Sequence, residues 1–403
     1  MLLSLKTKFR KRQSIVAFAL LFNTFAWYYL SRLIVTNVGN TFGEGSLGDL
    51  SLSLAYPSSI VLSAIAGSIF LAKKRRTHVL NAWLLFGVGA SLCSTILFGS
   101  SLLPTIAATV GLGMALGLGL PSALGYFAEA VSVENRGKAS GIILFGTFLS
   151  VPLIYMFMST QDLVASAAVL VAWRVWCLPL AFLIHGKENP SETAPKPLAF
   201  SSVLRHRTFI LYFIAWFMFG FIDSFETVVV NHALGDFRFV IKIVEPAIAA
   251  VATLVGGIFA DWIGRKRVLI FGFVSLGVAF AVLGLFAQLW FSWLFYFITD
   301  GIALGLLWVL FILVLWGDVA PNGSERVYAI GETPFFLTDI FSLFLTPYLA
   351  LIPESSSFSL AAFFLFLAVL PLLYAPETLP EKKIKDRELK QYIEKAKKKA
   401  MEK

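Results

Sequence analysis

The chain has 403 residues, of which 58% are hydrophobic and only 14% are charged. This balance excludes a water-soluble globular protein, because one core of this size cannot bury so many apolar side chains. The apolar runs are continuous rather than alternating, and in lipid only helices or closed barrels satisfy every backbone polar group. We therefore expect an all-α integral membrane protein.

Twelve predicted transmembrane helices follow one another, each about 20 residues long, which is the length that spans the hydrocarbon of a bilayer. They occupy residues 14–34, 50–72, 79–98, 102–126, 139–158, 163–185, 208–230, 239–260, 268–288, 291–316, 327–350 and 357–375. A polar linker at 186–207 separates two six-helix bundles, 1–185 and 208–376, and a basic cytoplasmic tail follows at 377–403. The start of the chain shows no short apolar region with a cleavage site, so we interpret it as a retained first helix.

The positive charges predict the orientation of the chain. With the first residues in the cytoplasm, 29 of the 33 lysines and arginines fall on cytoplasmic segments, and this bias is typical of the inner face of membrane proteins. We predict that both termini are cytoplasmic and that the chain is a multi-pass protein of the plasma membrane. Cations beside anionic lipid also account for the net charge of +9, so no nucleic-acid partner is expected.

The two bundles look like copies of one pattern. The same residue types recur after a shift of 189 positions, and charged and glycine positions align as well as apolar ones. The matched pairs include Gly67 with Gly256, Arg76 with Arg265, Glu129 with Asp318 and, one inserted residue later, Arg136 with Arg326. Parallel six-helix repeats around a central path are a known plan of transporters, in which substrate binds near the midplane. The alternative is a similarity of apolar composition alone.

A charged turn in the second half is the most specific motif. Residues 256–270 read GGIFADWIGRKRVLI, and this stretch resembles the loop signature G-x-x-x-D-x-x-G-[RK]-[RK] of the major facilitator superfamily. Its first-half copy, GSIFLAKKRRTHVL at 67–80, lacks the acid and the turn glycine. The segment GYFAEAVSVENRGKASG at 125–141 is similar to the E-x(6)-R-G-x(3)-G pattern of that superfamily, and WGDVAPNGSERVYAIG at 316–331 is a looser copy.

Two shorter pieces resemble the sugar-porter and organic-ion branch of the superfamily. They are AWRVW at 172–176 and APETLPE at 375–381. The acid that sugar porters carry in the first helix is absent, because that predicted span holds only Asn23 and Arg32 as large polar residues.

The resemblance implies a cytoplasmic gate. Its motif residues are Gly257, Asp261, Gly264, Arg265 and Lys266, and its expected partners are Glu129, Arg136, Asp318 and Arg326. A tight reversal at Gly264 and cations held at the headgroups explain the turn structurally. Asp261 carries the functional hypothesis, because a helix start stabilises a carboxylate.

The resemblance places the helix start that Asp261 contacts in the opposite half, around residues 137–140, with Arg326 as an ion-pair partner. Such a contact exists only while the cytoplasmic side is closed. We therefore expect Asp261 to favour the outward-open state.

Ionisable residues inside the spans are costly and are candidates for function. The candidates for a substrate and proton path are Arg174, Asp223, Glu226, Asp300 and Asp339. The alternative for them is a buried structural pair, such as Arg174 with Asp223 or Asp339. Arg32, Lys242 and Glu245 lie near predicted outer ends and are expected to reach the interface with their long side chains.

Two further patterns have structural explanations. The glycines of VGLGMALGLGLP lie in the middle of a span and follow no strand, so they predict close helix packing rather than nucleotide binding. These glycines are Gly111, Gly113, Gly117 and Gly119. Aromatic residues near outer span ends, among them Trp27, Tyr28 and Tyr29, are expected to form an interfacial belt.

These observations predict a secondary-active transporter of a small organic solute, either sugar-like or an organic ion or metabolite, with two halves that rock. A carboxylic acid in a low-dielectric cavity can load and unload a proton, so Asp223, Asp300 and Asp339 are candidate proton carriers and protons are the expected coupling ion. Arg174 is a candidate to hold an anionic substrate group. We expect a monomer that contacts anionic lipids, with no catalytic residue, metal or cofactor.

Two alternatives from other classes stay open. A polytopic membrane enzyme acting on a lipid-linked substrate would need large polar loops, whereas the longest predicted outer loop, 35–49, holds only Glu44 and Asp49 as acids. A receptor or scaffold derived from a transporter, without flux, is the other alternative.

Overall fold

The computed structural model describes residues 2–43, 45–71, 74–158, 162–184, 199–234, 243–319, 324–349 and 351–380. These residues form helices and short connections, so the prediction of an all-α chain is confirmed. The linker residues 185–198, the basic tail from 381 and Lys242 lie outside the described residues.

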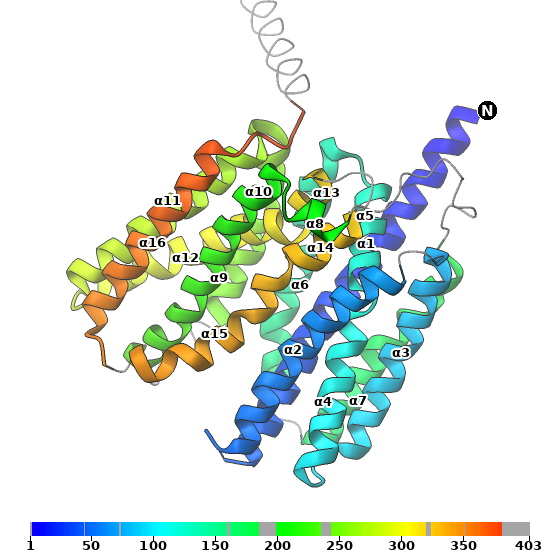
Figure 1. The fold of residues 1–403 in the computed structure, drawn as a ribbon, viewed down its shortest axis with the longest axis horizontal. Coiled ribbons are helices and arrows are strands. Elements are labelled where there is room, and N and C mark those ends of the chain that lie inside the picture. Colours follow the sequence, from blue (N-terminus) through cyan, green and yellow to red (C-terminus); the bar gives the residue numbers. More distant parts are fainter. Residues whose placement is uncertain are drawn as a thin grey trace, which may run out of the picture.

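The helices form two groups that are consecutive in sequence (Figure 1). The first group holds α1 (Leu2–Thr41), α2 (Leu47–Phe70), α3 (Arg76–Leu97), α4 (Leu102–Gly117), α5 (Leu120–Ala130), α6 (Arg136–Met158) and α7 (Leu163–Val175), with short 3-10 turns at Val133–Asn135 and Leu178–Phe182. The second holds α8 (Phe200–Val203), α9 (Arg207–Leu234), α10 (Glu245–Ile263), α11 (Arg265–Phe286), α12 (Trp290–Trp308), a π-helix η5 (Val309–Val314), α13 (Leu315–Val319), α14 (Ser324–Gly331), α15 (Thr333–Leu349) and α16 (Glu354–Tyr374). We call these groups the first and second halves; they meet where α6 packs on α10 and α2 on α15.

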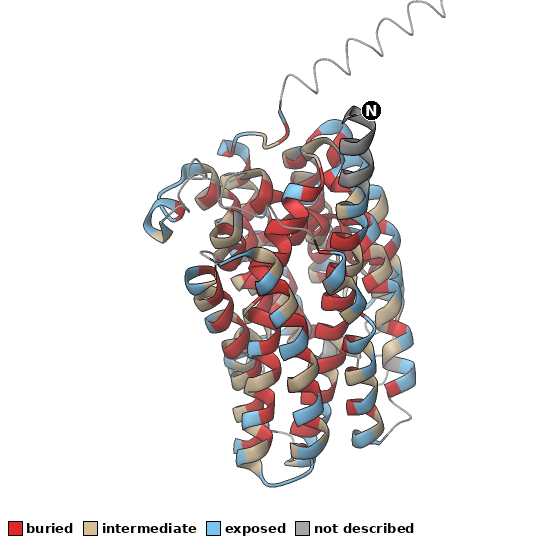
Figure 2. Ribbon diagram, turned by 90° about the vertical axis from the view of Figure 1, so that its right-hand side faces the viewer, coloured by how far each residue is buried: buried red, intermediate tan, exposed pale blue. Residues whose placement is uncertain are grey.

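Eleven helices within the described residues are long and apolar enough to cross a membrane. The predicted span at 327–350 is divided between α14 and α15, and α15 alone has 17 residues. The count of twelve spans therefore stays a prediction. Large apolar side chains such as Ile96 and Leu285 are 78% and 74% exposed. Exposed positions recur along the outer helices, where lipid would cover them (Figure 2).

Two sequence expectations about the outer ends are wrong. The first helix continues to Thr41, and Ser46 caps α2 by accepting a hydrogen bond from the Asp49 N–H, so the loop expected at 35–49 is much shorter. Trp27 and Tyr28 are buried, and Trp27 Nε1 donates to Ser91 Oγ at 3.1 Å. These aromatic residues therefore belong to the interior and not to an interfacial belt.

Glycines let α4 approach its neighbours closely. A Cβ atom at Gly113 or Gly117 would collide with α2, and one at Gly119 would collide with the ring of Trp83. A Cβ atom at Gly111 would meet nothing within 4 Å. The packing prediction thus holds for three of these glycines and is wrong for Gly111.

This difference gives a stability test. We expect Gly117→Val to lower the free energy of unfolding by roughly 1 to 3 kcal/mol, because the added methyl groups overpack the contact between α2 and α4. Gly111→Val is the matched control, since it adds the same atoms on the same helix in open space. Thermal unfolding of the purified variants measures the effect, and an equal loss of stability in both would contradict it.

Candidate substrate cavity and cytoplasmic gate

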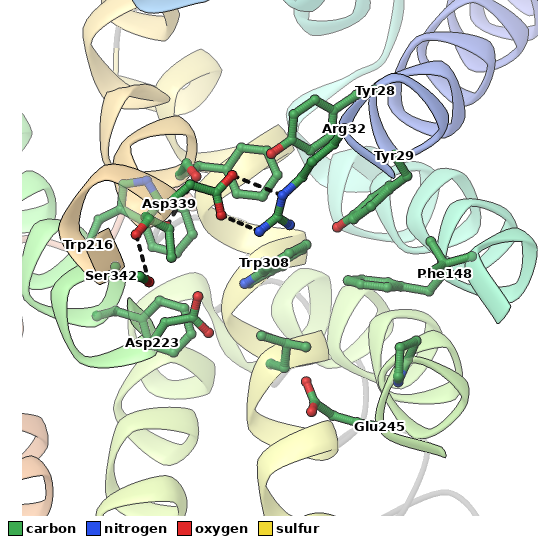
Figure 3. A pocket seen from close by; sticks show the side chains of 17 residues that line it. Tyr28, Tyr29, Arg32, Phe148, Trp216, Asp223, Glu245, Trp308, Asp339 and Ser342 are labelled. Carbon is green, nitrogen blue, oxygen red and sulfur yellow. Dashed lines mark hydrogen bonds and ion pairs between the residues drawn. The ribbon is translucent and has the colours of Figure 1, made fainter. Parts of the chain in front are cut away.

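A cavity of about 180 Å³ lies between the two halves. Its walls come from α1 and α6 of the first half and from α9, α10, α12 and α15 of the second (Figure 3). The polar side chains among its lining residues are Tyr28, Tyr29, Arg32, Trp216, Asp223, Glu245, Trp308, Thr338, Asp339 and Ser342. A small solute would therefore touch both halves at once, which is the arrangement expected of a site served by alternating access.

An ion pair joins the halves across this cavity. The Arg32 guanidinium on α1 donates two hydrogen bonds to the Asp339 carboxylate on α15, with Nε and Oδ2 2.9 Å apart. Arg32 thus points inward (Figure 3), and the expectation that it reaches the outer interface is wrong. The long first helix explains the error, because it carries Arg32 to cavity depth instead of to a span end.

Carboxylates concentrate on the second-half side of the cavity. Asp223 from α9 and Glu245 from the start of α10 line it (Figure 3), so Glu245 too is an interior residue and not an interfacial one. Glu226 and Asp300 are buried behind this lining, close enough to Asp223 and Glu245 to interact with them electrostatically. The structure therefore brings together four of the five residues that the sequence assigned to a substrate and proton path, namely Asp223, Glu226, Asp300 and Asp339.

Aromatic rings form the remaining walls of the cavity. The ring of Trp308 on α12 lies 5.1 Å from that of Phe148 on α6 and 5.0 Å from that of Phe335 on α15, measured between centroids. Tyr29 continues this row toward α1. Flat apolar faces beside carboxylates can hold a compact cation by both charge and cation–π attraction.

The fifth candidate, Arg174, lies elsewhere. Its side chain is fully buried inside the first half, where Nη1 donates to Asn23 Oδ1 at 2.9 Å and to Thr24 Oγ1 at 3.2 Å. Its guanidinium lies over the rings of Trp27 and Trp83, 5.2 and 4.6 Å from their centroids. This location is at odds with both sequence interpretations, a contact with substrate and a pair with Asp223 or Asp339.

The two halves also meet around Asp261, at the end of the molecule that the sequence predicts to be cytoplasmic. Its carboxylate, buried at the end of α10, accepts hydrogen bonds from the N–H groups of Gly137 at 3.0 Å and Lys138 at 2.8 Å. These residues begin α6 in the opposite half, which is the helix start that the motif predicts. Gly257 makes the approach possible, because a Cβ atom there would collide with the Gly137 carbonyl.

Asp261 pairs with Arg265, whose Nη1 lies 2.9 Å from Oδ1. The sequence interpretation places Arg265 at the headgroups; the turn at Gly264 between α10 and α11 instead brings its guanidinium back to the acid. The guanidinium of Arg326 lies over the ring of Phe200, 5.4 Å from its centroid.

A second acid connects the same arginine to the first half. Asp318 on α13 pairs with Arg265 through Nε at 3.2 Å and with Arg136, the first residue of α6. Arg265 also donates to the Val133 carbonyl at 2.6 Å. All three charged side chains are almost fully buried, so each charge depends on the others for compensation.

The repeat of the sequence reappears as a repeat of ion pairs. Arg76 and Glu129 of the first half pair at 2.8 Å, and their matched positions in the second half are Arg265 and Asp318. Arg76 also crosses to Glu325 on α14 at 3.0 Å. Each half therefore contributes one arginine that joins an acid of its own half to the other half.

Glu377 completes the second-half turn and was missed as a site residue. Its carboxylate accepts hydrogen bonds from the N–H groups of Arg265 at 2.9 Å and Lys266 at 3.1 Å, at the start of α11. Gly264 has a φ of 107°, which a side chain would strain, and a Cβ atom there would collide with Glu377. The quoted APETLPE stretch contained this acid, but no spacing along the chain shows that it folds back onto the turn.

Comparisons with known proteins agree with this geometry. Residues 244–400 match the sequence model described as Major Facilitator Superfamily. The human organic anion transporter MFSD10 has a similar structure, with a TM-score of 0.69 and 14% identity over 90% of this chain and 99% of that one. The chain has the major facilitator fold, and its second half matches that superfamily in sequence.

Two further solved structures share this major facilitator fold. The proton:xylose symporter XylE is similar with a TM-score of 0.68 and 16% identity, over 92% of this chain and 97% of that one. FucP in an outward conformation is similar with a TM-score of 0.67 and 12% identity, over 90% of this chain and 99% of that one. No curated protein matches the chain by sequence. At these identities the likeness concerns the fold alone.

The buried contacts of Asp261 give a direct test of the predicted gate. We expect Asp261→Asn to weaken the closed cytoplasmic side by roughly 1 to 2 kcal/mol, because the amide cannot compensate Arg265 or accept two charge-assisted hydrogen bonds. The rate at which a thiol reagent labels Ser140→Cys, a buried position on the first turn of α6, should rise by a factor of about 5 to 30.

Asp162→Asn is the matched control for this experiment. Asp162 is an exposed N-cap of α7, and asparagine caps a helix as well as aspartate does. Unchanged labelling in Asp261→Asn, or an equal rise in the control, would refute the role of Asp261 in closing the gate.

Proposed function

We propose that this membrane protein is a secondary-active transporter that moves a small organic solute by alternating access. The observation that carries the proposal is the cavity between the halves, with Arg32 of one half bonded to Asp339 of the other. Any solute that separates this pair or binds beside it changes the interaction between the halves. Binding and rocking are then linked by the same atoms.

The closed cytoplasmic contacts define the state that we assign to the molecule. Asp261, Arg136 and Arg76 each bond to a residue of the opposite half. These bonds must break before the cavity can open to the cytoplasm, so in our proposal they favour a state that faces outward or is occluded. We further propose that the chain lies in the plasma membrane as a monomer, with twelve spans and both termini in the cytoplasm. In this proposal it acts without a cofactor or catalytic residue, and its basic tail contacts anionic lipid.

Between the two solute classes left open by the sequence, the cavity favours an organic cation. The charged side chains among its described lining residues are three carboxylates, Asp223, Glu245 and Asp339, and one guanidinium, Arg32. A sugar site would need several neutral donors and acceptors, whereas the described lining residues include no asparagine or glutamine. Trp308, Phe148 and Phe335 supply the flat faces that suit an ammonium group.

Ligand screening tests the solute class. We expect small amines and quaternary ammonium compounds to raise the thermal unfolding temperature of the purified protein, by the equivalent of about 2.7 kcal/mol at 100 times their dissociation constant. Asp223→Asn should weaken this effect, and Asp162→Asn should leave it unchanged. Stabilisation by sugars or carboxylates, without an effect of amines, would contradict the proposed class.

Protons are the coupling ion that we propose, because buried carboxylates line the site where the solute binds. In proteoliposomes, an imposed pH gradient should drive accumulation of the solute by wild-type protein. The double variant Asp223→Asn and Asp339→Asn, measured at solute concentrations that compensate for its weaker binding, should lose a larger share of gradient-driven accumulation than of counterflow exchange.

The same liposome experiment separates the competing outcomes. Accumulation that ignores the gradient, or that survives in the double variant, would exclude coupling through these acids. A protein that binds the solute but shows no counterflow would be a receptor rather than a transporter.

A further inference from the structure

A buried carboxylate lies between the cavity and the cytoplasm and has no part in the gate contacts described above. Glu332 is 4% exposed and lies where α14 ends and α15 begins. Within the described residues, the indole of Trp316 is the side-chain group that faces its carboxyl as a hydrogen-bond donor, and neither carboxylate oxygen completes a hydrogen bond of good geometry. It precedes Asp339 by seven residues, which is about 10 Å along a helix toward the cytoplasmic end.

The surroundings of Glu332 come from both halves. It faces a small space lined by Val61 and Ala64 of α2 and by Leu120, Pro121 and Leu124 of α5. This space has a volume of about 10 Å³, at or below what a single water needs. Glu332 therefore borders a dry, apolar contact between the two halves.

Few polar groups face Glu332 from its own half. Tyr328 lies on α14 and donates its hydroxyl to the Leu313 carbonyl at 2.7 Å, so its proton is already used. The indole of Trp316 on α13 packs against Gly331 and is directed at the Glu332 carboxyl, the acceptor that lies within its reach. Arg136 and Asp318 are the charges nearest to Tyr328, and they compensate each other.

A charged carboxylate in such a place, with one neutral indole as its donor and no ion-pair partner within the described residues, would cost several kcal/mol. The neutral acid avoids most of that cost. When α14 and α15 move away from α2 and α5, water can reach the group, and the ionised form is then favoured.

We propose that Glu332 is a proton-binding site of the cytoplasmic gate, holding its proton while the gate is closed and releasing it to cytoplasmic water when the gate opens. The O–H bond of the carboxyl breaks, the proton passes to water, and the carboxylate left behind is hydrated. Because the closed state holds one more proton, acidic pH favours closure and alkaline pH favours opening. The proposal rests on the proposed transport function, since it assigns the inner end of the proton path.

Labelling of a gate cysteine tests this proposal without any solute. Ala64→Cys places a thiol on α2 inside the space that Glu332 faces. The exposed Cys93 is replaced by serine in all proteins, so that it does not react. The protein that keeps Ala64 gives the background rate of labelling. At each pH, the rate of thiol labelling with Glu332 present is divided by the rate with Glu332→Gln. The pH dependence of the thiol itself is the same in both proteins and therefore cancels in this ratio. We expect a ratio near one at acidic pH that rises with pH, by about tenfold per pH unit at most.

Glu354→Gln, at the first residue of α16, is the control, and its labelling rates should equal those of wild type at every pH. A ratio that stays at one across the pH range would overturn the proposal. If Glu332→Gln does not fold, Glu332→Asp takes its place, because a shorter acid should shift the pH at which labelling changes; identical pH profiles would again overturn it. Counterflow in proteoliposomes tests the transport function separately. A flat labelling ratio would overturn the role of Glu332 alone, and an absence of counterflow would overturn the transport function alone.

Discussion

The burial of opposite charges between two halves of one chain is the constraint on which this structure depends. Asp261, Arg265, Asp318 and Arg136 are withdrawn from water together, and none could stay ionised there alone. Their compensation requires the first residues of α6 to lie against the ends of α10 and α13. The closed gate is thus fixed by electrostatics, and helix packing along α6 and α10 supplies the surface on which it forms.

Charge is distributed unequally between the two halves. None of the six predicted spans of the first half contains an aspartate or glutamate, while those of the second half contain several. Among the buried cations of the first half, Arg174 is held by Asn23, Thr24 and two indole rings, whereas Arg136 pairs with Asp318 of the second half. The first half therefore offers a rigid wall with one cation, Arg32, directed at the cavity, and the titratable groups lie opposite it.

The sequence predicted the features that short-range rules control. Continuous apolar runs indicated helices, because helix formation depends on neighbours along the chain, whereas the contact of Asp261 with the start of α6, 124 residues away, was expected only from the resemblance of the motif. The positions of Arg32, Glu245 and Arg174 were predicted wrongly, because the depth of a side chain depends on helix length and tilt. Glu325 and Glu377 were not assigned to the site, since their partners are more than 100 residues away.

The backbone of the two halves is irregular at matched places. In the first half, α4 ends at Gly117 and α5 starts at Leu120; the positions 189 residues later fall at the end of α12 and the start of the π-helix η5. An interrupted ladder of hydrogen bonds resists bending less than an unbroken α-helix does. Each half thus has an irregular backbone at an equivalent depth, where the acid-bearing segment that ends near Glu129 or Asp318 can bend relative to the rest of its helix at low cost.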